Sequence, residues 1–239
     1  MSDHQDPTIV LVHGAFADSS SWNGVVANLQ GRGYDVTAVA NPLRGLQPDA
    51  AYLRSVIDSL PDPVVVAGHS YGGSVMSEAA DSATNVKALV YVASFNLEAG
   101  ESTGQLAAKF PGGELGTALK PVPFPLPDGG TGTDLYIQQD EFHRVFAADV
   151  DPDQARLMAA TQRPIASSAL EDLATKAAWK TIPSWTMVTL QDLAIPADSM
   201  RFMAQRAGST TVEIDASHAV TVSRPDAVAD LIHQAATAG

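Results

Sequence analysis

The feature that most constrains the fold is the pentapeptide Gly-His-Ser-Tyr-Gly at residues 68–72, taken together with the residues on each side of it. The apolar, mostly β-branched residues 64–67 are typical of a buried strand, and the mainly small residues 73–80 suit a helix packed closely against a sheet. A serine on a tight turn between a strand and a helix is the arrangement known as a nucleophile elbow. The turn strains the Ser70 backbone, and the flanking glycines have no Cβ to clash with it. We therefore expect a sheet in which this strand leads directly into a packed helix.

The rest of the chain alternates between short apolar strands and segments with a helical period. Strands are expected at 8–12, 34–40, 64–67, 86–93, 184–190 and 210–214, and helices at 19–30, 49–60, 73–80, 197–207 and 227–235. Strands that are apolar on both faces and alternate with helices belong to parallel sheets covered on both sides. The sequence therefore predicts an α/β fold, with a mainly parallel sheet of about six strands flanked by helices.

One long stretch, residues 97–180, interrupts this alternation. Its first part is rich in proline and glycine between residues 111 and 130, which predicts loops there. Helices are expected after these loops, at 138–147, 152–160 and 168–178. An insertion of this length is seldom an idle loop. We predict an α/β core at 1–96 and 181–239, and a helical cap insertion at 97–180 that lies over the edge of the sheet where the strands end.

Composition narrows the function classes and the partners. The 239 residues carry a net charge of −13, which disfavours nucleic acid and anionic membranes as partners. The chain has no cysteine, and no apolar run approaches the roughly 18 residues of a membrane span. The N-terminus lacks the apolar core of a signal peptide, so we expect a cytoplasmic protein. Neither metal-ligand spacing nor a phosphate-binding glycine loop is present, so we expect no metal and no cofactor. The sequence does not decide the oligomeric state, and a homodimer is one of the alternatives.

A serine hydroxyl becomes a nucleophile only when a base takes its proton and an anion orients the base. The chain order expected on this fold is serine, acid, histidine. His218 lies in the loop between the last strand and the last helix, where the base belongs, and Asp192 closely follows a predicted strand. Competing acids are Asp215, which is close to the histidine along the chain, and Asp198, which suits the first turn of a helix. We predict Ser70 as nucleophile, His218 as base and Asp192 as the acid.

The oxyanion of such a reaction needs two backbone N–H donors. Tyr71, directly after the nucleophile, supplies one; the loop after the first strand supplies the other, with Ala15 preferred and Phe16 second. Aromatic and methionine side chains are expected to line an apolar substrate pocket, although such residues also serve as plain interior packing. The candidates are Phe16 and Phe95 from the core, and Tyr136, Phe142, Phe146, Met158 and Trp179 from the cap insertion. No Arg or Lys falls in the catalytic motifs, which favours an uncharged substrate.

These motifs resemble the α/β-hydrolase superfamily over essentially the whole chain. Within it, Val-Leu-Val-His-Gly-Ala at 10–15, the elbow, Asp-Leu-Ala-Ile-Pro at 192–196 and the Ser-His pair at 217–218 are similar to the group of plant methyl-salicylate esterases and hydroxynitrile lyases. The lyases of that group carry a lysine directly after the catalytic histidine, where this chain has Ala219. The resemblance therefore implies the esterase branch. The plant esterases usually have methionine at this position, so the pocket shape is expected to differ.

The sequence thus predicts a serine carboxylesterase that cleaves small to medium, uncharged, hydrophobic esters through an acyl-enzyme. A serine at the elbow argues against the dehalogenases and epoxide hydrolases of this fold, which place aspartate there. Two alternatives stay open. One is a ligand-binding, receptor-like protein with slow or lost hydrolysis. The other is a different reaction on the same scaffold: a lactonase, a C–C hydrolase, a lyase or a cofactor-free oxygenase.

Overall fold

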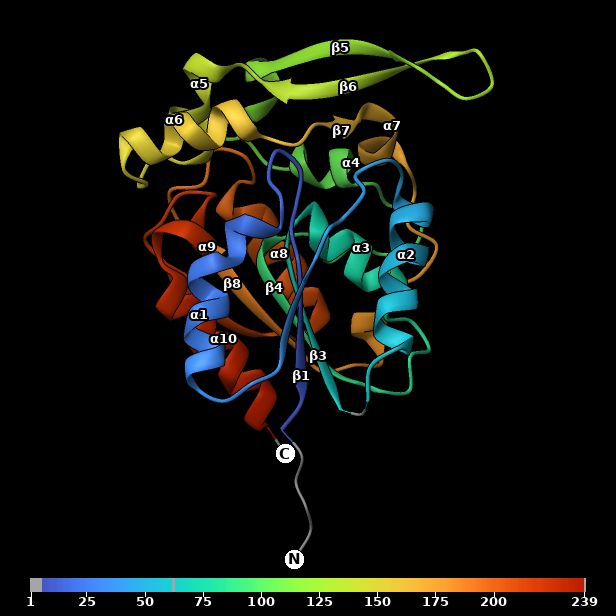
Figure 1. The fold of residues 1–239 in the computed structure, drawn as a ribbon, viewed down its shortest axis with the longest axis vertical. Helices are drawn as coiled ribbons and strands as arrows, with labels where there is room; N and C mark the ends of the chain where they lie inside the picture. The colour runs from blue at the N-terminus through green and yellow to red at the C-terminus, as the bar shows by residue number, and fades with distance from the viewer. Residues whose placement is uncertain (1–5, 62, 239) are drawn as a thin grey trace, which may run out of the picture.

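The computed structural model describes residues 6–61 and 63–238, and within them a six-stranded parallel sheet has helices on both faces (Figure 1). The strand order is β2-β1-β3-β4-β8-β9, and every neighbouring pair is parallel. The strands are β1 Thr8–Val12, β2 Val36–Val39, β3 Val64–Ser70, β4 Val86–Ser94, β8 Ser184–Thr189 and β9 Thr210–Ile214. β1 and β3 are buried along their whole length, as their largely apolar sequences favour. The predicted fold class is confirmed.

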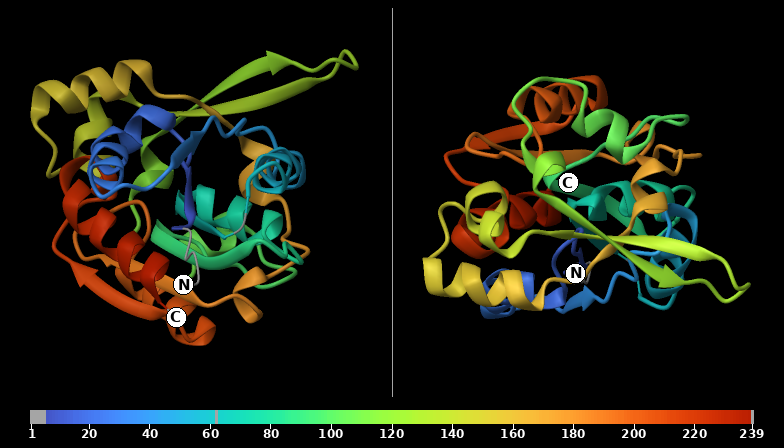
Figure 2. Two further views of the ribbon diagram at one scale, coloured as in Figure 1. Left: turned by 60° about the horizontal axis from the view of Figure 1, so that its bottom comes forward. Right: turned by 90° about the horizontal axis from the view of Figure 1, so that it is seen from above.

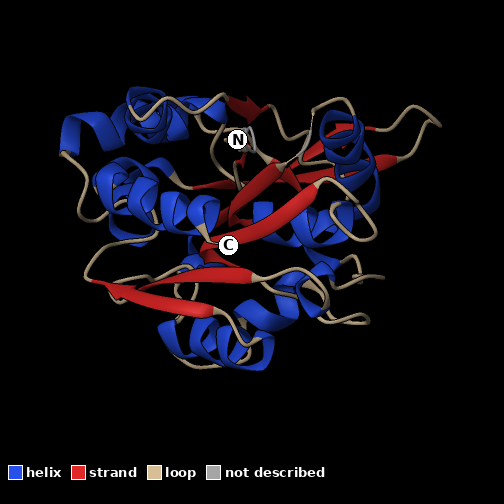
Figure 3. Ribbon diagram, turned by 90° about the horizontal axis from the view of Figure 1, so that it is seen from below, coloured by secondary structure: helices blue, strands red, loops and turns tan. Residues whose placement is uncertain are grey.

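The helices divide between the two faces of the sheet according to the direction of each crossover. Right-handed connections place α2 (Leu46–Asp58), α3 (Tyr71–Ala79) and α8 (Ala197–Ala207) on one face, because each leads toward β9. α1 (Asn23–Gly31) leads the other way and packs with α10 (Pro225–Thr237) on the opposite face (Figures 1 and 3). In the described part of the chain, no helix is long and apolar enough to cross a bilayer.

Two helices of the core begin at residues that differ from the prediction. The segment expected as one helix from residue 19 opens with a 3₁₀ turn, η1 (Ser19–Trp22), before α1 begins. The Asp18 carboxylate accepts from the Ser20 backbone N–H, so the chain is capped there and turns tightly. α2 begins at Leu46, earlier than expected, because the carboxylate of Asp172, far along the chain, accepts from the Leu46 N–H at 2.8 Å. Asp18 is a local capping residue, whereas the contact with Asp172 is not evident from local sequence.

Most of the segment at residues 97–180, called the cap segment below, lies at the end of the sheet where the strands finish, and its last residues run back beside α3 to the start of β8 (Figure 1). Its proline-rich part, expected as loops, forms β5 (Leu119–Pro125) and β6 (Thr131–Ile137), an antiparallel hairpin that projects from the body (Figure 2). β7 (Ile165–Ala166) adds a third strand. The loop prediction was therefore wrong for β5, and β6 and β7 lie where the sequence predicted neither loop nor strand.

The helices of the cap segment follow the prediction in part. α5 (Gln139–Phe146) and α6 (Pro152–Thr161) lie where helices were expected. The third expected helix stops early: α7 covers only Ser167–Glu171. Beyond it, the Ala174 N–H donates to the Glu101 carbonyl, and the Glu78 carboxylate accepts from two further N–H groups of the segment. The backbone there is satisfied by distant groups, which removes the need for helical hydrogen bonds.

Candidate active site

Ser70 occupies a strained turn at the end of β3. Its backbone lies at φ 53° and ψ −128°, outside the regions that residues with a Cβ favour. The turn is packed too tightly for side chains on either side: a Cβ on Gly68 would lie 2.7 Å from the Gly72 backbone, and one on Gly72 would lie 2.3 Å from the Val12 carbonyl oxygen. The Ser94 hydroxyl donates to the Ser70 carbonyl at 2.6 Å. This packing explains how the strained conformation is held.

Asp192 and His218 meet as a buried hydrogen-bonded pair. The His218 Nδ1 lies 2.7 Å from Asp192 Oδ2, and both residues are almost fully buried. The carboxylate also accepts from the backbone N–H groups of Ala194 and Ile195 and from the Thr189 hydroxyl, each at 2.8 Å. These three donors and His218 satisfy the hydrogen-bonding capacity of the buried Asp192 carboxylate. Because Nδ1 donates to the carboxylate, Nε2 keeps its lone pair and is free to accept a proton.

His69, the residue before Ser70, links the turn to the His218 loop. Its Nε2–H donates to the His218 carbonyl at 2.8 Å, and the two ring centroids are 4.7 Å apart. Burial, and then the neighbouring His218, lower the pKa of His69 to about 3, so its ring stays neutral and does not compete as a base. The Ser70 hydroxyl makes no hydrogen bond with any residue that the structure describes. The structure therefore joins the acid to the base and the base to the turn, while proton transfer from Ser70 stays a prediction.

The competing acids are placed elsewhere. Asp215 is exposed, and Asp198 lies in the first turn of α8, where it pairs with Arg201 at 2.9 Å. Among the residues described, no three His, Asp or Glu side chains converge as a metal site requires. Of the carboxylates considered from the sequence, Asp192 is the one that contacts the histidine.

The loop after β1 passes directly beside the serine. A Cβ on Gly14 would lie 2.7 Å from the Ser70 Cβ, so only glycine permits this approach. The loop is held by His13, whose Nε2 accepts from the Asn41 N–H at 3.0 Å and whose Nδ1–H donates to the Gly14 carbonyl at 2.9 Å. Burial lowers the pKa of His13, which matches a neutral ring that both donates and accepts.

The backbone N–H groups of the three candidate oxyanion donors, Ala15, Phe16 and Tyr71, have different surroundings. The Phe16 N–H donates to the Arg163 carbonyl at 3.0 Å and is therefore occupied. This contact leaves Ala15 as the better candidate from that loop. Tyr71 is the first residue of α3, where a helix N–H has no partner within the helix. Both candidate residues also line the cavity described next.

A cavity of about 60 Å³ adjoins Ser70. Phe16 and Phe95, both predicted to contact substrate, lie in its wall together with Tyr71. Sequence reasoning missed most of the other lining residues, namely Thr103, Gly104, Ala107, Leu115, Leu170, Ala194 and Ile195. The sequence held one sign of the helix that carries Thr103, Gly104 and Ala107. Ser102 and Gln105 have the spacing of a capping box, and they cap α4 (Thr103–Ala107).

The predicted cap residues are distributed over several places. Phe146 packs edge-on against the His218 ring at 4.9 Å between centroids, and the buried Phe142 packs behind it. Met158 lines a separate hollow of about 280 Å³, and Tyr136 lines a groove of about 530 Å³ beside the hairpin. Trp179 is buried packing whose indole N–H donates to the Leu97 carbonyl at 2.8 Å. Phe146 thus packs against a member of the predicted catalytic set.

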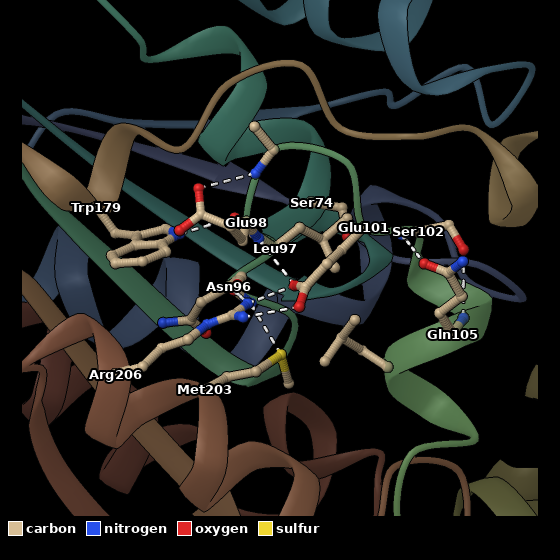
Figure 4. Close-up of polar contacts among 12 residues, drawn as sticks. Ser74, Asn96, Leu97, Glu98, Glu101, Ser102, Gln105, Trp179, Met203 and Arg206 are labelled. Atoms are coloured by element: carbon tan, nitrogen blue, oxygen red, sulfur yellow. Dashed lines mark hydrogen bonds and ion pairs between the residues drawn. The ribbon is translucent and has the colours of Figure 1, made fainter.

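A polar network fixes the cavity wall that α4 supplies (Figure 4). Arg206 of α8 donates to both carboxylate oxygens of Glu101, at 2.5 and 2.8 Å, and to the Asn96 carbonyl at 2.6 Å. Burial opposes ionisation of Glu101, but these hydrogen bonds hold its pKa below the usual value. The Arg206 guanidinium also lies 5.5 Å from the centroid of the Trp179 ring. The segment leading into α4 is therefore tied to the core helix α8.

A buried carboxylate that the sequence did not reveal supports Tyr71. The Tyr71 hydroxyl donates to Asp49 Oδ2 at 2.9 Å, and the Arg44 N–H donates to the same carboxylate at 3.1 Å. Asp49 is almost fully buried, and burial raises its pKa. Burial and the nearby Asp49 carboxylate also raise the pKa of Tyr71, so the phenol stays protonated. The contact orients the side chain that follows the nucleophile.

Comparison with known proteins places this geometry in context. The model of the alpha/beta hydrolase family matches residues 9–231. Alpha/beta hydrolase nvfD of Aspergillus novofumigatus is 27% identical over 254 residues, which cover 96% of each sequence. The crystal structure of polyneuridine aldehyde esterase superimposes with a TM-score of 0.82 at 20% identity, over 96% of this chain and 99% of that one. The methylesterase MES16 from Arabidopsis gives 0.78 at 18% identity, over 96% and 98%. At these identities, the two structures establish a shared fold.

Proposed function

The chain belongs to the alpha/beta hydrolase family, and we propose that it is a serine hydrolase that cleaves small to medium, uncharged, hydrophobic carboxylic esters. The predicted resemblance to this superfamily, and to its plant esterases in fold, is confirmed. The observation that carries the proposal is the buried Asp192–His218 hydrogen bond of 2.7 Å, on a loop tied to the strained turn that holds Ser70.

The proposed reaction begins with attack of Ser70 Oγ on the ester carbonyl carbon. His218 Nε2 takes the hydroxyl proton and later gives it to the departing alcohol, which leaves an acyl-enzyme. Asp192 holds the imidazole in the required tautomer and stabilises the imidazolium that forms. Water, activated by the same histidine, then releases the acid. In this proposal, the backbone N–H groups of Ala15 and Tyr71 stabilise the oxyanion.

The surroundings of Ser70 support an ester without charge. The cavity beside it is lined mainly by apolar side chains, and no Arg or Lys belongs to its wall. The esterase and the methylesterase of the same fold support this reaction class, since both names describe ester cleavage. A charged acyl group would enter such a cavity at the cost of its hydration without gaining an ion pair.

The proposal is tested with p-nitrophenyl acetate and the variants Ser70→Ala and Ser55→Ala. Ser55 is an exposed serine of α2, so its replacement controls for the loss of a hydroxyl. We expect Ser70→Ala to lower kcat by at least about 10³-fold, and Ser55→Ala to match wild type. Repeated turnovers by wild type separate an enzyme from a receptor-like binder. Equal rates in wild type and Ser70→Ala would refute the proposal.

A further inference from the structure

We propose that Asp149, in the turn that follows α5 of the cap segment, is a positioning residue for the catalytic base. It acts through Ser217, the residue before His218, and so sets where the imidazole stands relative to Ser70. This inference rests on the proposed serine hydrolase, because it takes His218 as the general base. It adds a residue of the cap segment to a catalytic set that otherwise comes from the core.

The Asp149 carboxylate binds the residue that precedes the base. The Ser217 hydroxyl donates to Asp149 Oδ1, and Ser217 is 2% exposed. The Phe146 carbonyl, at 3.4 Å, is the more distant acceptor of the same hydroxyl. Asp149 Oδ2 lies 3.7 Å from a guanidinium nitrogen of Arg224, so an ion pair holds the carboxylate from its other side. Because a buried hydroxyl that loses its acceptor is costly, this contact fixes the position of Ser217.

The same part of the cap segment also holds the other side of the base. The Ala219 N–H donates to the Phe146 carbonyl at 2.9 Å, and the Phe146 ring packs edge-on against the His218 ring at 4.9 Å between centroids. The turn itself is fixed, because the Nε2–H of His143 donates to the Val150 carbonyl at 3.0 Å. The residues before and after the base are therefore both tied to the end of α5 and the turn that follows it.

The core and the cap segment hold different parts of the loop that carries the base. From the core, Asp192 accepts from the His218 ring at 2.7 Å, and His69 donates to the His218 carbonyl at 2.8 Å. The Ser217 hydroxyl has both of its acceptors in the cap segment. Proton transfer from Ser70 requires a close approach of the imidazole, and a misplacement of about 1 Å can cost roughly 100-fold in rate. Losing the acceptor in the cap segment would release one side of this loop.

Turnover of p-nitrophenyl acetate by Asp149→Ala tests the assignment, with Asp134→Ala as the matched control. Both carboxylates belong to the cap segment, are 21% and 14% exposed, and pair with an arginine of the core, but the partner of Asp134 is Arg44, outside the loop of the base. We expect Asp149→Ala to lower kcat by about 10- to 100-fold. KM should stay within about threefold, because the base serves both half-reactions and neither Asp149 nor Ser217 lines the cavity beside Ser70. Asp134→Ala should match wild type.

Three further variants separate positioning from a plain loss of stability. Asp149→Asn keeps an oxygen that accepts from the Ser217 hydroxyl, so it should recover most of the lost kcat. Ser217→Ala should show the same loss as Asp149→Ala. The double variant should be no slower than either single one, because residues that act as a unit have non-additive effects. Where Asp149→Ala fails to fold, Ser217→Ala, which removes a single oxygen atom, decides the matter.

The outcomes separate this inference from the proposed function. Ser70-dependent turnover that both single alanine variants leave at the wild-type rate, or that Asp134→Ala slows equally, would overturn the positioning role and leave the serine hydrolase standing. Losses that multiply in the double variant, or an Asp149→Asn variant as slow as Asp149→Ala, would overturn it as well. Absence of Ser70-dependent turnover in wild type would reject the serine hydrolase, and the positioning role with it.

Discussion

A neutral imidazole lies directly against the candidate base, because the ring of His69 is buried and hydrogen bonded to the His218 carbonyl. Its folded pKa, about 3, is below the value of 6.5 that an unfolded chain would show. Between these values the unfolded state binds more protons than the folded state, so acid favours unfolding. His69 thus ties the stability of the active-site turn to pH.

We predict that replacing His69 with glutamine weakens this pH dependence. Glutamine keeps a side-chain N–H donor but cannot titrate. The free energy of unfolding of wild type should fall between pH 7 and pH 4.5 by about 2 kcal/mol more than that of His69→Gln. Urea denaturation at the two pH values measures this difference of differences, which cancels groups common to both proteins. An equal loss in both would show that His69 is not held neutral by the fold.

At the scale of the element, the β3–α3 turn depends on contacts that exclude a single methyl group. Gly72 faces the Val12 carbonyl oxygen, which an added Cβ would approach to 2.3 Å, and the His13 carbonyl, which it would approach to 3.0 Å. Both contacts are with backbone, which cannot rotate away as a side chain can. The sheet and α3 would have to separate to admit alanine.

We therefore predict that Gly72→Ala lowers the free energy of unfolding by about 3 kcal/mol and abolishes ester turnover. The matched control is Gly31→Ala at the end of α1, where an added Cβ meets nothing within 4 Å. There the helix propensity of alanine should raise stability by up to about 1 kcal/mol. Urea unfolding midpoints compare the two. Similar effects at both positions would contradict the packing that the turn requires.

The hairpin of the cap segment shows why some elements escaped prediction. Proline normally argues against a strand because it cannot donate to the ladder. In β5, Pro121, Pro123 and Pro125 alternate on an edge strand that pairs with β6 alone, so their missing N–H groups fall on the unpaired side. An edge without donors also resists pairing with another chain. The pattern that suggested a loop is thus compatible with an edge strand, and only the tertiary pairing distinguishes them.

Over the whole molecule, what could be predicted followed from local pattern and chain order. Continuous apolar strands indicated the parallel sheet, and the position of Asp192 and His218 after successive strands anticipated their contact. The cavity wall could not be found in this way, because Leu115 and Leu170 are ordinary aliphatic residues brought to Ser70 by the cap segment. The role of Asp49 could not be predicted either, because its partner Tyr71 lies 22 residues away and only the fold brings the two together.

The central claim is that Ser70 is made nucleophilic by His218 and Asp192. The most direct measurement is labelling with a serine-directed fluorophosphonate, followed by mass spectrometry of the peptides. We predict one adduct on Ser70 in wild type, no adduct at that peptide in Ser70→Ala, and labelling slowed by at least about 10³-fold in Asp192→Asn. An adduct on a different serine, or unchanged labelling in Asp192→Asn, would contradict this mechanism.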